Sequence, residues 1–485
     1  MSIVHLAPQP LWRHFQALCD RPRPSKHEQL VIDYLRDFAV QHSLTFLQDE
    51  VGNVVIKKAA SPGMEKARTI AMQCHIDMVP QKRNDIAHDF FNDPIQPVVD
   101  GDIVRAQGTT LGADNGIGVA AMLAIMESTD IAHGPLEALF TVDEEAGMSG
   151  AKGLNSQILE AEILFNLDSE DEGELYVGCA GGVDVTLTCP VSTLPSYGDV
   201  HGLTLHFSGL RGGHSGIDIH LGRANANLLL ADVLLELRAR FDIHIVELNG
   251  GTLRNAIPRD ARATIIVPAR HVAAVKAHCQ QFLANKQRVF ESTEPTMALA
   301  IETCTVAQRY YDSGQIDTLL RAVLASPNGV LERHPEHAEI IQTSSNLAII
   351  KSIDGGVQVQ CLVRSAENAA KYRAGRNIAA CYDDLSPAVV VDGAYSGWRP
   401  NMDSPVLAKM ADLYARDFGA RPEVKVIHAG LECGILGGIY PHLDMISFGP
   451  TIRCAHSPDE YVDIASVARF WDYLCTSLTE VAKSA

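Results

Sequence analysis

The sequence lacks the features that mark nucleic-acid-binding proteins. It contains no Lys- or Arg-rich run and no stripe of interleaved basic and aromatic residues. Its 40 Lys and Arg against 59 Asp and Glu give a formal net charge of −19. So acidic a chain repels the phosphates of nucleic acids and of anionic lipids. We therefore expect no nucleic-acid partner.

Long apolar runs and paired cysteines are also missing. The apolar stretch 117–126 is too short to cross a bilayer. The first residues lack the basic region and the apolar run of a signal peptide. The eleven cysteines include no C-x-x-C pair, which is typical of reduced thiols in a cytosolic protein. We expect a cytoplasmic protein with no membrane partner.

The chain itself has the composition of a globular protein, with 46% hydrophobic and 20% charged residues. Ser25 and Glu28 have the spacing of a capping box, and apolar positions at helical spacing follow to about Gln41. Short apolar runs at 69–74 and 136–142 predict buried strands, with a helix at 115–127 between them. Another such run follows at 163–167. Alternating strands and helices predict an α/β domain with a mostly parallel sheet flanked by helices.

The pattern changes after about residue 183. Alternating strands and long helices predict an α+β domain over 184–392, which could contain two related sub-units. The α/β pattern returns after residue 392, with a final helix at 464–481. We therefore expect a catalytic domain formed by residues 1–183 and 393–485 and interrupted by an inserted α+β domain.

Polar residues follow the predicted strands of the catalytic domain where each strand ends. In open α/β sheets, ligands bind at the carboxyl ends of the strands, so these side chains are expected to share one crevice. Asp114 would join them because it precedes a helix, where the dipole favours a carboxylate. The strand-end residues are His75, Asp77, Glu144, Glu145, Asp168 and His456.

This set has the chemistry of a two-metal site, in which two divalent ions about 3.5–4 Å apart share a bridging carboxylate. Asp114 suits the bridge. The terminal ligands would be His75 with Asp168 on one ion, and Glu145 with His456 on the other. Two residues then remain for other roles: Asp77 to orient the His75 ring, and Glu144 to act as general base.

Each residue alone carries little weight. His-x-acid spacing arises by chance in so His- and acid-rich a chain, as at His337 and Glu339. Asp114 alone could be a helix cap, the Glu144–Glu145 pair a solvated turn, and His456 a surface histidine. Their joint occurrence at several strand ends favours the metal site.

Other classes of function fit parts of the pattern. His75, Asp77 and His456 match a two-His-one-carboxylate iron site of an oxygenase, which leaves the other acids unused. Residues 116–121 match G-x-G-x-x-A without a convincing strand before them, which favours helix packing over dinucleotide binding. An acidic metal-binding protein without catalytic activity is a further alternative.

The strings around these residues resemble a known family. The matching strings are CHIDMVP at 74–80, LGADNG at 111–116, DEEAG at 143–147, LDSE at 167–170 and CAHSPDE at 454–460. They are similar to the co-catalytic metallopeptidases that include carnosinase-type dipeptidases, peptidase T and aminoacylase. The resemblance implies the dimetal exopeptidase fold with an inserted lid and dimerisation domain. It places the family's metal and catalytic roles on the residues assigned above.

The resemblance also implies substrate contacts. RGGHSG at 211–216 resembles the family's lid segment, so that His214 would polarise the scissile carbonyl. Arg364 would bind the terminal carboxylate, Asn255 lies in another substrate-facing segment, and Glu432 could pair with the free amine or serve helix packing. The implied activity is hydrolysis of unblocked dipeptides, including Xaa-His dipeptides such as carnosine, by a homodimer that holds two divalent ions in each subunit, Zn or else Co or Mn. The alternative within the family is a deacylase or carboxypeptidase acting on N-blocked substrates.

Overall fold

The structure is a computed structural model and describes residues 2–196 and 198–483. The chain forms two compact units. The first comprises Met1–Gly178, Pro400–Val426 and Leu431–Ala485. The second comprises Cys179–Arg399 and Ile427–Gly430. Within the described residues, no helix is both long and apolar enough to cross a membrane.

The boundaries of the units differ slightly from the expected ones. The expected boundaries at 183/184 and 392/393 fall inside strands β9 (Gly181–Pro190) and β21 (Ala388–Tyr395). These two strands pair with each other along most of their length, so both belong entirely to the second unit. The main-chain N–H of Ala180 also donates to the carbonyl of Ile427, which attaches 427–430 to the same unit.

The first unit contains an eight-stranded sheet in the order β1-β2-β6-β3-β7-β23-β8-β22. Its four central strands run parallel: β6 (Leu136–Thr141), β3 (Ile70–His75), β7 (Ile163–Asn166) and β23 (Asp444–Ser447). The outer strands β1 (Thr45–Gln48), β2 (Val54–Lys58) and β8 (Glu174–Cys179) pair antiparallel, and β22 (Glu423–Ile427) ends the sheet. The α/β prediction is confirmed, with parallel pairing confined to the centre.

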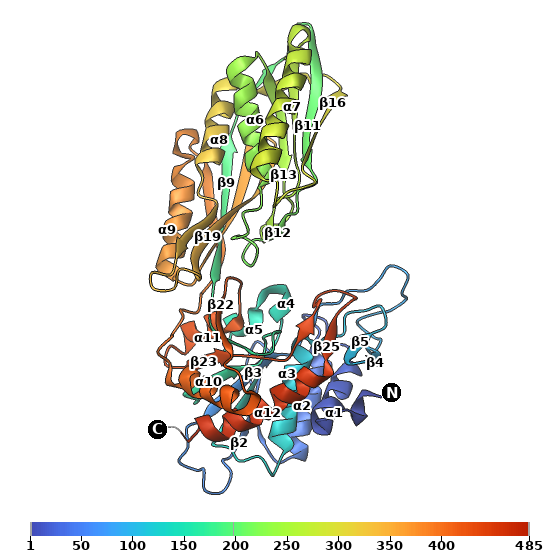
Figure 1. The fold of residues 1–485 in the computed structure, drawn as a ribbon, viewed down its shortest axis with the longest axis vertical. Helices are drawn as coiled ribbons and strands as arrows, with labels where there is room; N and C mark the ends of the chain where they lie inside the picture. The colour runs from blue at the N-terminus through green and yellow to red at the C-terminus, as the bar shows by residue number, and fades with distance from the viewer. Residues whose placement is uncertain (1, 197, 484–485) are drawn as a thin grey trace. The chain divides into compact units, whose positions relative to one another are not determined.

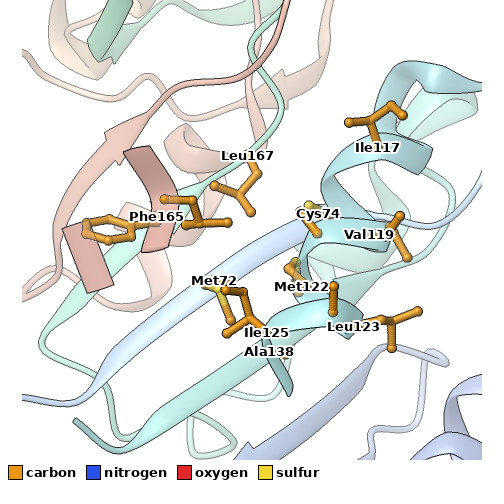
Figure 2. Packing of buried hydrophobic residues seen from close by; sticks show 14 of the residues in the cluster. Met72, Cys74, Ile117, Val119, Met122, Leu123, Ile125, Ala138, Phe165 and Leu167 are labelled. Carbon is orange, nitrogen blue, oxygen red and sulfur yellow. The ribbon is translucent and has the colours of Figure 1, made fainter. Parts of the chain in front are cut away.

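The central parallel strands are buried, and most of their side chains are apolar. Every residue of β3, β6 and β7 is buried. Helix α3 (Ala113–Glu127) packs against this centre and is itself buried on almost all sides. Figure 2 shows Met72 and Cys74 of β3 beside Met122 of this helix. Apolar strands covered on both faces are the arrangement expected of a parallel sheet.

Further helices complete the first unit (Figure 1). They are α1 (Gln9–Cys19), α2 (Gln29–Gln41), α4 (Glu144–Gly147), α5 (Ser149–Lys152), α10 (Pro405–Phe418), α11 (Glu432–Ile439) and α12 (Ile464–Val481). A small sheet in the order β24-β25-β5-β4 lies in the same unit. Its strands are β24 (Ile452–Arg453), β25 (Tyr461–Asp463), β5 (Ile103–Ala106) and β4 (Pro97–Asp100).

The capping-box prediction for α2 was wrong, although the helix ends at Gln41 as expected. The helix begins at Gln29 and has no side-chain cap. The Ser25 hydroxyl donates instead to the Asp77 carboxylate (2.7 Å). The Glu28 carboxylate accepts from the main-chain N–H groups of Lys26 and Asp143. Tertiary contacts thus use the side chains that a local cap would need.

The second unit contains a nine-stranded sheet in the order β16-β11-β15-β13-β19-β20-β9-β21, with β18 paired to β19. The strands not yet bounded are β16 (Ala298–Cys304), β11 (Val200–Ser208), β15 (Ala261–Pro268), β13 (His244–Gly250), β19 (Ile341–Ile353), β20 (Gly356–Ser365) and β18 (Gly329–Arg333). Helices α6 (Ala226–Arg240), α7 (Val272–Val289), α8 (Ser313–Ala325) and α9 (Asn368–Ala380) pack on it. The two sets of strands that suggested related sub-units therefore share one sheet.

Candidate metal centre

The ends of the parallel strands bring the predicted ligands together. His75 is the last residue of β3, Glu145 lies in the first turn of α4 directly after β6, and Asp168 follows β7 by two residues. Asp114 lies at the start of α3, and His456 lies in the loop between β24 and β25. Since β3, β6 and β7 run in the same direction, their carboxyl ends lie at one edge of the sheet.

Two clusters of ligand atoms that share Asp114 form there, beside a third group made by His75, Glu144 and Glu145. In the first, His75 Nε2 lies 3.1 Å from Asp114 Oδ1 and 3.3 Å from Asp168 Oδ1. In the second, His456 Nε2 lies 3.1 Å from Asp114 Oδ2 and 3.0 Å from Glu145 Oε2. The ligand atoms of each cluster lie within 4.8 Å of one another. Asp114 thus offers a different carboxylate oxygen to each cluster.

The electrostatics of these groups favour a bound cation. Burial raises the pKa of Asp168 and of Glu145. Hydrogen bonds that the His456 ring donates to the Asp114 and Glu145 carboxylates raise the pKa of His456 to about 11. Burial alone would lower the pKa of His75, but the neighbouring carboxylates, Asp168 foremost, raise it well above its usual value. Carboxylates gathered at such a buried site require positive charge nearby.

The donor set also fits divalent ions chemically. Imidazole nitrogen and carboxylate oxygen are ligands of first-row transition metals, for which the histidines must be neutral. Within the described residues, Glu145 Oε1 is buried and has no hydrogen-bond partner. Such an orphaned oxygen is the atom that a metal ion would satisfy.

Asp77 contacts more of this centre than the sequence indicated. Its carboxylate is fully buried and accepts hydrogen bonds from the N–H groups of Glu144 (3.0 Å) and Glu145 (3.1 Å), and from Ser25. His75 Nδ1 lies 3.4 Å from Asp77 Oδ1 and 3.2 Å from its main-chain oxygen. Burial raises the pKa of Asp77, but the hydrogen bonds from His75 and Ser25 outweigh it and lower the pKa. One carboxylate therefore holds both the His75 ring and the Glu144–Glu145 turn.

Glu144 and Glu432 lie close to the metal ligands. Burial, together with the charge of Asp168, raises the pKa of Glu144 well above its usual value. Glu432 is fully buried at the start of α11, and its Oε2 accepts from Gln73 Nε2 and Thr141 Oγ1, both at 2.6 Å. Glu432 Oε1 has no partner among the described residues. Burial raises the pKa of Glu432 to about 8.

The second unit brings together His214, Arg364 and the Asn255 segment. Arg364 is only 4% exposed, and its guanidinium donates to Tyr395 Oη (2.9 Å) and Ser215 Oγ (3.3 Å). The main-chain oxygen of Asn255 accepts from the Ser215 N–H (2.8 Å). A cavity of about 520 Å³ is lined by Asn255, Arg364 and Tyr395, among others. Tyr395 was missed because only the β20-β9-β21 strand order, not sequence spacing, brings it to Arg364.

The hydrogen bonds of His214 define its tautomer. Its Nδ1 accepts from the N–H groups of Gly216 (3.1 Å) and Ile217 (3.0 Å). Burial and the charge of Arg364 lower the pKa of His214 to about 4. The neutral ring must therefore carry its proton on Nε2. This Nε2 lies 3.4 Å from Arg364 Nη2, so the ring N–H and the guanidinium N–H are two neighbouring donors. In the described part of the chain, no carboxylate lies within 4 Å of the Arg364 guanidinium.

Comparison with known proteins assigns the fold and the family. The sequence profile of peptidase family M20/M25/M40 matches residues 71–480. The chain belongs to this family. It is 42% identical to the cytosol non-specific dipeptidase of Escherichia coli strain K12 over 482 residues, which cover 99% of both chains.

Two solved structures show the same fold. The aminoacylhistidine dipeptidase of Vibrio alginolyticus has a TM-score of 0.91 at 41% identity, over 99% of this chain and 98% of that one. The aminopeptidase PepT of Bacillus cereus shares the fold, with a TM-score of 0.58 at 15% identity over 99% and 100% of the two chains. The resemblance drawn from the sequence is confirmed: the chain is a peptidase, which sets aside the oxygenase and the non-enzymatic alternatives.

Proposed function

We propose that this M20 peptidase hydrolyses unblocked dipeptides, including Xaa-His dipeptides such as carnosine, with the help of two divalent metal ions. The observation that carries the proposal is the position of Asp114, which turns one oxygen toward His75 and the other toward His456. A shared carboxylate between two His-carboxylate pairs is the arrangement that a two-ion site needs. The names of the relatives from Escherichia coli and Vibrio alginolyticus support dipeptides as the substrate class.

The proposed ligands are those that the two clusters contain. His75 and Asp168 would hold one ion, Glu145 and His456 the other, and Asp114 both. Zn suits these nitrogen and oxygen donors, with Co and Mn as alternatives. When bound, the ions supply Lewis acidity: they lower the pKa of a water molecule and polarise the scissile carbonyl.

The side chains around the ions would transfer the proton of the attacking water and stabilise the negative charge that develops on the carbonyl oxygen. Glu144 accepts a proton from the attacking water and delivers it to the leaving amine, a role suited by its raised pKa. Asp77 holds the Glu144 backbone and the His75 ring in place. The Nε2–H of His214 is available to donate to the carbonyl oxygen as negative charge develops there.

The substrate's two charged ends would determine the preference for unblocked dipeptides. Arg364 is a buried guanidinium without a carboxylate partner among the described residues, which suits it to bind the terminal carboxylate beside Asn255. Glu432 Oε1 is available to accept from the free amine. A deacylase or carboxypeptidase would instead need a neutral, N-blocked group at that end.

The proposal extends to location and assembly. The named cytosolic relative and the absence of C-x-x-C pairs support a cytoplasmic enzyme. The family resemblance supports a homodimer through the inserted unit. The edge strand β21 exposes three consecutive valines, 389–391, and such an apolar edge is commonly covered by another chain. Sedimentation of the purified protein measures the assembly, and a monomer alone would contradict it.

An assay with matched substrates tests the activity. Purified protein is incubated with carnosine, with a simple dipeptide and with the N-acetylated form of that dipeptide, before and after removal of metal by a chelator. We expect cleavage of both free dipeptides, loss of cleavage with chelator, and recovery with Zn, Co or Mn. Cleavage of only the N-acetylated substrate would favour the deacylase or carboxypeptidase alternative. Full activity after complete metal removal would overturn the proposal.

A further inference from the structure

Arg23 is a buried cation that no proposed step uses. Its side chain is 2% exposed. Nη1 donates to the main-chain oxygens of Ile76 (3.0 Å) and Asp77 (2.9 Å), and Nη2 donates to that of Gly112 (2.5 Å). In the described structure, no carboxylate lies within 4 Å of this guanidinium. Burying a charge without an ionic partner is costly, so the three carbonyls must be held firmly to compensate.

Glu460 also binds the segment that ends at Asp114, but as a hydrogen-bond acceptor, whereas Arg23 is a donor. Its side chain is also 2% exposed. Oε2 accepts from the N–H groups of Leu111 (2.7 Å) and Gly112 (3.0 Å), and Oε1 from those of Ala113 (2.8 Å) and Asp114 (3.3 Å). One carboxylate thus gathers four successive amides that end at Asp114.

These two residues join the segments that carry three of the proposed ligands. Arg23 links the turn after His75 to the segment before Asp114. Glu460 links that segment to the loop of His456, because it lies four residues after His456 in the same loop. Asp114 must present its two oxygens to two different imidazoles, so its backbone has to be fixed relative to both.

Two glycines make room for the guanidinium. A Cβ added at Gly112 would lie 2.6 Å from Arg23 Nη2, and one added at Gly116 would lie 2.7 Å from the same atom. Gly112 also has a φ of 70°, a conformation that favours glycine. A Cβ at Gly112 would also lie 2.9 Å from Met78 Sδ, and one at Gly116 would lie 2.9 Å from Phe15 Cε2. Both glycines are thus required where Arg23 and a second side chain pack against the LGADNG segment.

We propose that Arg23 and Glu460 are positioning residues that clamp the segment 111–114 and so set the spacing of the two metal sites. This clamp fixes Asp114 relative to His75 and His456 without contact to substrate. The inference rests on the proposed two-ion function. It predicts that disturbing either residue weakens metal binding and kcat while leaving the KM for dipeptides unchanged.

Two conservative substitutions test the clamp. R23K keeps the positive charge, but one ammonium cannot reach the Asp77 and Gly112 carbonyls together as the guanidinium fork does. E460Q keeps the shape, but its amide group would face two N–H donors. Arg21 provides the matched control, because it lies two residues from Arg23 and its guanidinium donates to the Ala17 carbonyl and lies over the Tyr34 ring, away from the 111–114 segment. R21K should behave as wild type.

The readout is metal binding as well as turnover. Competition with a chromogenic chelator measures the affinity for Zn²⁺, and the absorption spectrum of the Co²⁺-loaded protein reports the ligand geometry. We expect R23K and E460Q to bind metal about 10–100-fold more weakly, a typical effect of losing groups that orient ligands. We also expect an altered Co²⁺ spectrum and a lower kcat at unchanged KM.

Each outcome distinguishes residues that only stabilise the fold from residues that position the metal ligands. If R23K does not fold, G116A replaces it, because that Cβ would press on Arg23 Nη2 and on the Phe15 ring while Arg23 itself stays. Folded variants with wild-type metal affinity and spectrum would overturn the clamp, even if their melting temperatures fall. Wild-type protein that fails to bind two ions would overturn the proposed function and the clamp with it. Wild type with two ions and unaffected variants would overturn the clamp alone.

Discussion

Replacing Asp77 by Asn is the most informative single change at the centre. The substitution keeps the shape of the side chain but exchanges one carboxylate oxygen for an NH₂ group. In the wild type, Oδ1 accepts from the Glu144 N–H and Oδ2 accepts from the Glu145 N–H and the Ser25 hydroxyl. Whichever way the amide turns, its NH₂ faces one main-chain N–H. At least one buried donor must lose its partner.

The structure sets the size of the effect. A hydrogen bond to a charged group contributes about 1.5–3 kcal/mol, and a buried unsatisfied donor costs about 1–3 kcal/mol more. D77N should therefore lower the free energy of unfolding of the first unit by about 2.5–6 kcal/mol. Because Asp77 also lies against the His75 ring, the proposed base and two ligands shift together. Misplacement of reacting groups by about 1 Å can cost about 100-fold in rate, so kcat should fall by at least that factor.

Ser25 offers the matched control. S25A removes one donor from the same carboxylate, leaves both main-chain contacts and strands no buried donor, so it should cost about 1.5 kcal/mol and little activity. The measurements are urea unfolding of the metal-free protein, metal content, and kcat on a free dipeptide. D77N with a kcat close to that of S25A, and with unfolding unchanged, would refute the assignment of Asp77 as the residue that organises the centre.

Other predictions address the base, the amine site and the response to acid. E144Q should lower kcat by about 10²–10⁴-fold with metal content intact, and metal analysis beside steady-state kinetics checks both. E432Q should raise the KM for free dipeptides but not for N-acetylated ones; equal KM values for the wild type and the variant would remove Glu432 from the amine site. Burial, aided by the charge of Arg364, lowers the pKa of His428 to about 3, whereas the unfolded value is 6.5. The neutral ring thus stabilises the second unit fully above pH 6.5, and this contribution is lost as the pH falls toward 3, by about 2 kcal/mol at pH 5. H428Q, which can keep the hydrogen bond to Ser344, should flatten this dependence in pH-dependent unfolding of the metal-free protein, and an unchanged slope would contradict it.

Much of the first unit was predictable because its signals are local. Buried strands such as β3 and β7 are short apolar runs, and the polar residues directly after them mark the sheet edge where ligands bind. The residues of the two clusters could thus be proposed from strand ends alone. The arrangement of the outer strands could not, because short antiparallel strands such as β1 and β8 carry no signal of where they pair.

The roles of Arg23 and Glu460 could not be predicted from the sequence, because both side chains contact main-chain atoms of residues far away in the sequence. Arg23 is separated from Gly112 by 89 residues, and Glu460 from Asp114 by 346. A side chain that binds main-chain carbonyls or amides leaves no complementary residue type to notice in the sequence. The Ser25–Glu28 pattern predicted a capping box wrongly for a related reason, because both side chains bind residues far away in the sequence.

The position of β23 constrains the order in which the chain can fold during synthesis. This strand, residues Asp444–Ser447, lies inside the first sheet between β7 and β8, not at an edge. The ribosome therefore synthesises the whole second unit before the first sheet can close. Until residue 456 has also emerged, the second metal cluster lacks its histidine. The nascent enzyme should remain inactive, with a gap at the centre of its sheet, until nearly the last residues are made.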